Sequence, residues 1–153
     1  MMQRVYLVIM DETAESALAL RFAARRALRT GGTVHILALV PKLDFVAFGS
    51  VQATIEEEAR DRAEVLATTA AGSLASESGL VPLIAVKQGD GPDVVRAYLK
   101  DHPEVSALVL GTAAEGAPGP LVSHFIANNP GRLPCPVMLV PGSMSEIEID
   151  RLT

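Results

Sequence analysis

Short apolar runs alternate along the chain with longer segments in which apolar residues recur at helical spacing. The runs are continuous rather than alternating with polar residues, as is typical of parallel strands that are buried on both faces. Five such runs predict five strands: Val5–Met10, Val34–Val40, Leu80–Val86, Val105–Leu110 and Pro136–Val140. Strands that alternate with helical segments indicate βαβ units.

The segments between the strands carry helix start and stop signals. Thr13 can cap a first helix, which the pair Gly31-Gly32 ends. A long second helix is predicted over Gln52–Ser76, and Pro92 stands at the first position of a third helix. A short helix or turn is predicted to run to about Asn129. The pattern therefore predicts four helices between and around the strands.

The chain shows no linker, repeat or low-complexity segment, so we expect one domain over residues 1–142 and a tail over 143–153. In the tail, Ser145 and Glu148 have the spacing of a capping box, which predicts a short helix. Right-handed crossovers between parallel strands give an open sheet with helices on both faces. The predicted fold class is therefore α/β, a doubly wound five-stranded parallel sheet.

The composition argues against two classes of function, membrane-spanning proteins and nucleic-acid-binding proteins. Of the 153 residues, 49% are hydrophobic and 20% are charged, but every apolar run is well short of the roughly 20 residues that cross a bilayer. The formal net charge is −5, and the one basic cluster, RFAARRALR, has the character of a solvated helix face rather than a nucleic-acid surface. Cys135 is the only cysteine, so it forms no intrachain disulfide, and we expect it to pack as a small hydrophobe. No secretory cleavage site follows the first strand, so we expect a cytoplasmic protein with neither a membrane nor a nucleic-acid partner.

Candidate chemistry lies where the strands end, because ligands of such sheets bind at the carboxyl ends of the strands beside the point where the strand order reverses. The positions there are Asp11, Val40, Gly89–Gly91 and the loop Gly111–Ser123. In that loop Gly111, Gly116 and Gly119 would let the backbone approach a phosphate closely. Glycine and proline are equally common in a tight surface turn, so the loop alone leaves both interpretations open.

Three segments resemble the universal stress protein family. They are the opening VYLVIMDETAESALALRFAARRA, the strand ALVLGT before a glycine loop, and the closing PCPVMLVP, in the same order and spacing. The resemblance implies the strand order 3-2-1-4-5, an adenine nucleotide alpha hydrolase-like sheet. It also implies a homodimer, commonly formed through the last strand, Pro136–Val140, and ATP binding in many members.

The resemblance also implies roles for single residues. Asp11 and Val40 match the positions that hold the adenine end, and Gly111 matches the first glycine of a loop for ribose and phosphates. Ala114 stands where the second glycine is expected, and the next glycine is Gly116.

The rest of the loop is also altered. The family's final glycine and hydroxyl residue fall on Ser123 and His124, which can still donate hydrogen bonds, and the loop is about one residue shorter than the pattern. Gly119, with its flanking prolines, offers an alternative backbone nest for an anion.

Three functions follow as hypotheses. The first is a stress-response module that binds ATP or another adenine nucleotide, with magnesium, at the carboxyl ends of strands one, two and four. The second is a nucleotide-free dimeric module of the same fold that binds a further protein. The third, an adenylating enzyme, would need a glycine-rich loop after strand one, where Asp11-Glu12-Thr13 is acidic instead. The sequence contains no catalytic constellation and no metal-spaced cluster, so we expect at most a slow ATPase.

Two further features carry expectations. The connection Leu43–Val51 is unusually apolar, and we expect it to cover the pocket or a partner's surface. His35 lies inside a predicted strand, where we expect a packed or edge residue rather than a functional one.

Overall fold

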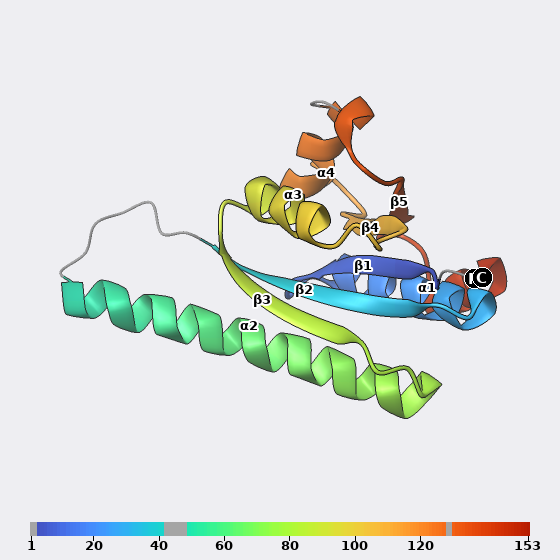
Figure 1. Cartoon of the computed structure of the whole chain (residues 1–153), viewed down its shortest axis with the longest axis horizontal. Coiled ribbons are helices and arrows are strands. Elements are labelled where there is room, and N and C mark those ends of the chain that lie inside the picture. The colour runs from blue at the N-terminus through green and yellow to red at the C-terminus, as the bar shows by residue number, and fades with distance from the viewer. Residues whose placement is uncertain (1–2, 42–48, 128–129) are drawn as a thin grey trace.

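The computed structural model describes residues 3–41, 49–127 and 130–153. Within them, five parallel strands form one sheet in the order β3-β2-β1-β4-β5, which confirms the predicted fold class (Figure 1). The strands are β1 (Val5–Met10), β2 (Thr33–Pro41), β3 (Leu83–Gly89), β4 (Ala107–Thr112) and β5 (Val137–Pro141). The strand order reverses between β1 and β4, so the topological switch point lies there.

The first helix starts and ends at the predicted kinds of residue, and the second is longer than predicted. Helix α1 spans Ala14–Thr30; the Thr13 side chain accepts a hydrogen bond from the Ser16 amide, and Gly31 ends the helix with φ 67°. Helix α2 spans Gly49–Ser78, and its 30 residues make it about 45 Å long. It starts before the expected Gln52 and so includes the end of the predicted apolar connection. The rest of that connection, residues 42–48, lies outside the described residues.

The second half of the chain contains shorter helices. They are α3 (Gly91–Asp101), α4 (Pro120–Val122), the π-helical turn η1 (Ser123–Ala127), the 3-10 turn η2 (Pro130–Arg132) and α5 (Glu146–Leu152). Ser145 and Glu148 form the capping box at the start of α5. The Arg21 guanidinium on α1 makes a double hydrogen bond to Asp150 on α5, with distances of 2.8 and 2.7 Å. The tail therefore folds back onto α1.

Two apolar layers hold the helices on the sheet. Helices α1, α2 and α5 pack over one face, around a core that includes Val8, Ile36 and Ile149. Helix α3 and the α4–η1 segment cover the other face, around Leu7, Leu108 and Phe125. All six of these side chains are fully buried. No helix in the described part of the chain is long and apolar enough to span a membrane.

Four of the five strands differ from the predicted bounds, and β2 is longer by one residue at each end, at Thr33–Pro41. Strand β3 begins at Leu83 rather than Leu80, because Pro82 has no amide hydrogen for the sheet ladder. Strand β4 begins at Ala107 rather than Val105, whose amide donates to the His102 carbonyl in a turn. Strand β5 is shifted by one residue, to Val137–Pro141. The apolar runs located the strands, while local hydrogen bonding set where each begins.

Candidate functional site

The carboxyl ends of β1 and β4 lie side by side at the switch point. β1 pairs with β2 on one side and with β4 on the other. Asp11 directly follows β1, and Gly111 and Thr112 are the last residues of β4. Sheets of this class bind ligands in the crevice that lies beyond the carboxyl ends of the strands at this point.

Asp11 is exposed and is held by the turn that begins α1. Its Oδ1 accepts a 2.8 Å hydrogen bond from the Thr13 amide and a short one from the Thr13 hydroxyl. The Ser16 hydroxyl donates to the Asp11 carbonyl over 2.9 Å. Its second carboxylate oxygen, Oδ2, makes no hydrogen bond within the described chain. Asp11 is therefore fixed in place with one oxygen available to a ligand.

Gly111 is required by helix packing, whatever it contributes to a ligand. A Cβ at this position would lie 2.2 Å from the Glu15 carbonyl oxygen, because α1 crosses β4 closely. Gly142, just after β5, is equally constrained: its Cβ would lie 2.4 Å from the Thr112 carbonyl oxygen. The first glycine of the predicted loop thus has a structural function of its own.

Gly116 and Gly119 are different. Their φ angles are 76° and 116°, and a Cβ at either position would meet nothing within 4 Å. The loop closes on itself through a 3.2 Å hydrogen bond from the Ala113 amide to the Pro118 carbonyl. These two glycines therefore combine unusual backbone conformations with open space, as a backbone that approaches a ligand requires.

Two hollows meet at Asp11. One, of about 250 Å³, lies between the ends of β1 and β2 and helix α2, with Leu39, Pro41, Leu66 and Arg62 among its walls. The other, of about 130 Å³, lies over the switch point. Its walls include Asp11, Gly111, Pro118, Gly119 and Leu121. We call the two together the Asp11 cleft.

Val40 does not line the Asp11 cleft with its side chain, which is 1% exposed and packs in the core beneath α1 and α2. Its neighbours Leu39 and Pro41 line the larger hollow instead. Arg62 was missed in the sequence. It follows Ala59 and precedes Ala63 and Leu66, which also line the hollow, so helical spacing from the buried stripe of α2 was the signal that could have identified it.

Ser123 and His124 lie outside both hollows. Ser123 is exposed at the start of η1. The half-buried His124 ring has its Nε2 3.3 Å from an Arg96 guanidinium nitrogen on α3, and it contacts Phe125 edge-on. Arg96 also lies over the Phe125 ring, 5.2 Å from its centroid. A role for these two residues in ligand binding stays a prediction.

The walls of the Asp11 cleft are more acidic than basic. Asp11, Glu12 and Glu15 line it, and Arg62 is the one cation among its described walls. Within the described residues, no group of three or more His, Cys, Asp or Glu side chains is placed to hold a metal ion. A phosphate in the cleft would therefore gain little from side-chain charge and would depend on backbone amides and on its own counter-ion.

A parallel sheet in the order 3-2-1-4-5 with a crevice at its switch point defines a doubly wound α/β protein. The family model of the universal stress protein family matches residues 2–141. The chain therefore belongs to the universal stress protein family.

Three solved structures with the same fold are universal stress proteins, and two of them contain a nucleotide. Universal stress protein UspA from Lactobacillus plantarum is 19% identical with a TM-score of 0.77, over 92% of this chain and 99% of that one. A family protein from Arabidopsis thaliana with AMP bound is 17% identical with a TM-score of 0.59, over 91% of each chain. The universal stress protein from Archaeoglobus fulgidus in complex with dAMP is 18% identical with a TM-score of 0.58, over 91% of this chain and 97% of that one. No curated protein is significantly similar in sequence.

Proposed function

We propose that this universal stress protein binds an adenine nucleotide in the Asp11 cleft. The observation that carries the proposal is the meeting of two hollows at Asp11, which is fixed by the turn of α1 with Oδ2 available. Similar structures from Arabidopsis thaliana and Archaeoglobus fulgidus are described with AMP and dAMP. Both ligands are nucleotides with an adenine base and a single phosphate, whereas their sugars differ. The proposal therefore depends most on recognition of the adenine base.

The walls suggest how the nucleotide would lie. The larger hollow has apolar walls from Leu39, Pro41 and Leu66, which suit the faces of a purine ring, and Arg62 can stack on that ring. An Asp11 carboxylate oxygen can accept a hydrogen bond from the adenine amino group or from a ribose hydroxyl. The phosphates would then extend over the smaller hollow toward Gly116 and Gly119, where the backbone is open.

The acidic walls favour few phosphates. Each added phosphate brings negative charge toward Asp11, Glu12 and Glu15. Magnesium would be held through the phosphates and water, which is how this ion usually binds with nucleotides. We therefore expect AMP to bind at least as tightly as ATP without magnesium, and magnesium to improve ATP binding more than AMP binding.

The first test is to denature freshly purified protein, identify any released nucleotide, and titrate AMP and ATP calorimetrically with and without magnesium. Asp11→Ala should abolish detectable binding, and Arg62→Ala should weaken it about five- to tenfold, the loss expected from an exposed charge that also stacks on an aromatic ring. Glu64→Gln, an exposed change on the outer side of α2, serves as the control. An adenine nucleotide that binds Asp11→Ala as tightly as the natural protein would place the site elsewhere.

A nucleotide-free interaction module is the second candidate. Three observations favour it: the hollow over the switch point is only about 130 Å³, Ala114 replaces a loop glycine, and Arg96 contacts His124 outside the cleft. Absence of both co-purified nucleotide and heat of binding, in correctly folded protein, would support this function over the first.

We also propose that the protein forms a homodimer through β5. This strand pairs with β4 on one side and ends the sheet on the other, so its outer edge can pair with a second copy. Leu139 on this strand is 42% exposed, which an interface would cover. Light scattering after gel filtration should give a dimer mass, and Leu139→Lys should shift it toward the monomer.

A further inference from the structure

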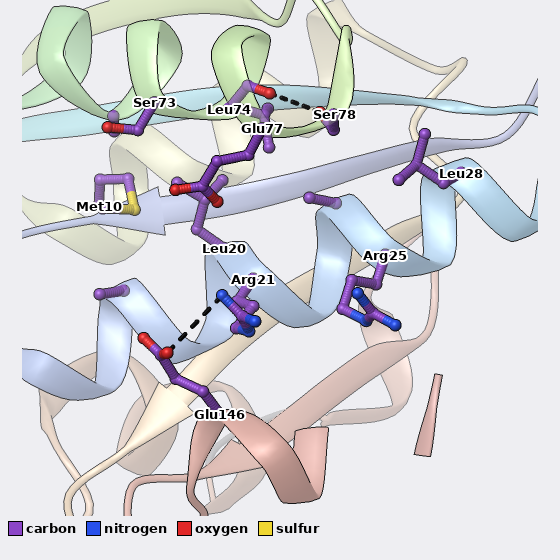
Figure 2. A pocket seen from close by; sticks show the side chains of 13 residues that line it. Met10, Leu20, Arg21, Arg25, Leu28, Ser73, Leu74, Glu77, Ser78 and Glu146 are labelled. Carbon is purple, nitrogen blue, oxygen red and sulfur yellow. Dashed lines mark hydrogen bonds and ion pairs between the residues drawn. The ribbon is translucent and has the colours of Figure 1, made fainter. Parts of the chain in front are cut away.

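Helices α1 and α2 leave a groove between their facing sides (Figure 2). Its volume is about 430 Å³, larger than either hollow of the Asp11 cleft. Leu20 and Ala24 of α1 and Ala70 and Leu74 of α2 form an apolar floor. The alanines leave room between two helices that larger residues would fill. The groove, which we call the α1–α2 groove, is therefore concave and largely apolar, as small-molecule sites usually are.

The two arginines at the edge of the α1–α2 groove are already paired. Arg21 makes its double hydrogen bond to Asp150 and lies 3.8 Å from a Glu146 oxygen. Arg25 lies 3.2 Å from Asp150 and donates a 2.9 Å hydrogen bond to the Thr153 hydroxyl. The hydrogen bond between Arg21 and Asp150 raises the pKa of Arg21 and lowers that of Asp150, so both remain charged near neutral pH. The positive charges of the two guanidinium groups and the negative charges of Glu146 and Asp150 therefore cancel beside α5.

Glu77 on the opposite edge is not balanced in this way. Its side chain extends from α2 toward Leu20 and Arg21 across the groove (Figure 2). It makes no ion pair within 4.0 Å in the described chain, although its charge contributes to the raised pKa of Arg21. Ser73, one turn earlier on α2, lines the same edge and offers a hydroxyl group. The α1–α2 groove thus combines an apolar floor with one exposed carboxylate that makes no ion pair within 4.0 Å in the described chain.

We propose that the α1–α2 groove binds a small organic cation with an apolar body, such as an aliphatic monoamine. The body lies on the floor formed by the leucines and alanines, and the ammonium group pairs with Glu77. An anion of the same size is repelled by the Glu77 carboxylate, and both arginines that could attract it are already paired with carboxylates. The site is separate from the Asp11 cleft: among the described residues, Met10 alone lines both the groove and a hollow of the cleft.

Three probes of equal chain length test the proposal: octylamine, octanoate and octanol, each titrated below its micelle-forming concentration and followed by amide chemical shifts in an NMR spectrum. Octylamine should shift the resonances of α1 and α2 around Leu20 and Leu74, and should bind about tenfold more tightly than octanoate, a difference that attraction in one case and repulsion in the other can supply. Equal binding of octylamine and octanoate would contradict the proposal.

Two variants separate this site from general attraction of a cation to an acidic protein. Glu77→Gln should weaken octylamine binding about three- to fivefold and leave octanol unchanged, because an ion pair with an exposed carboxylate has only this strength. Glu64→Gln removes the same charge from the outer side of α2 and should leave octylamine binding unchanged. Ala70→Leu should fill the groove and reduce the binding of both octylamine and octanol. Equal octylamine affinity in Glu77→Gln and Glu64→Gln would overturn the proposal, whatever the result for nucleotides.

Discussion

The two ends of strand β2 use their side chains in opposite ways. Near the amino end, His35 is 7% exposed and its Nδ1 lies 2.9 Å from the Tyr98 hydroxyl of α3. Tyr98 in turn stacks on His102, with ring centroids 3.9 Å apart. At the carboxyl end, Leu39 and Pro41 line a hollow instead. One end of the strand therefore encloses its polar group within the fold, and the other presents a surface to a ligand.

The difference shows how to separate structural from functional polar residues in this fold. Burial raises the pKa of Tyr98 to about 12 and lowers that of His35, and the two side chains share one hydrogen bond whose direction depends on the imidazole tautomer. No buried side-chain nitrogen or oxygen in the described residues lacks a hydrogen-bond partner. A fully satisfied pair contributes to stability and leaves nothing for a ligand, whereas Asp11 is exposed with one oxygen available.

Gly111 offers the largest test, because it lies at the ligand end of the sheet but serves packing. We expect Gly111→Ala to lower the free energy of unfolding by about 3 kcal/mol or more, since the new Cβ would lie 2.2 Å from the Glu15 carbonyl oxygen. Urea denaturation measures the loss. Gly116→Ala, with φ 76° and open space, should lose only about 1–2 kcal/mol.

A third glycine completes this series. Gly72 lies inside α2, where a Cβ meets nothing within 4 Å, so Gly72→Ala should gain about 0.5–1 kcal/mol from helix propensity. If Gly111→Ala were no less stable than Gly116→Ala, α1 and β4 would not approach as closely as the structure has them.

The second test removes the hydrogen bond between Tyr98 and His35 near the amino end of β2. Tyr98→Phe removes the hydroxyl that pairs with His35 and leaves a buried imidazole nitrogen without a partner, which should cost about 1–3 kcal/mol of unfolding free energy. Tyr6→Phe is the matched control, because its hydroxyl bonds over 3.3 Å to a Thr30 hydroxyl that also donates to the Arg26 carbonyl. Tyr98→Phe should leave AMP affinity unchanged, and a loss of affinity would mean that the two ends of β2 are coupled.

The sequence predicted the sheet more completely than the cleft, for a physical reason. Each strand is signalled by its own apolar run, so all five were located, and the glycines and caps that end α1 act on neighbouring residues. The first residue of a strand was harder to predict, because it depends on single hydrogen bonds. Pro82 has no amide hydrogen to give to the sheet, and the Val105 amide bonds in a turn instead.

The Asp11 cleft depends on residues far apart in the chain. Asp11 could be placed from the sequence, since it must follow the first strand. Helical spacing places Arg62 beside the buried stripe of α2, but its place in the cleft depends on how α2 crosses the ends of β1 and β2. A place for Val40 beside the adenine stays a prediction: its side chain is buried in the core, and the path of β2 in three dimensions shows that its neighbours Leu39 and Pro41 line the hollow.

The smallest predicted effect is the dependence of stability on pH that arises from His35, near the amino end of β2. Burial lowers the pKa of His35 in the folded protein, partly opposed by Glu104 and assisted by His102. The unfolded chain, with a histidine pKa near 6.5, then binds more protons than the folded one as the pH falls. The free energy of unfolding should therefore decrease as the pH drops below about 6.5.

His35→Gln, which retains a hydrogen-bonding partner for Tyr98, should flatten this dependence, and His102→Gln should change it less. Urea denaturation between pH 5 and pH 8 measures both slopes, a range set by the ordinary titration of histidine. A natural protein whose stability changes no more steeply than that of His35→Gln over this range would show that the imidazole is accessible to protons in the folded state. The amino end of β2 would then be open to solvent like the carboxyl end, and the contrast between the two would be lost.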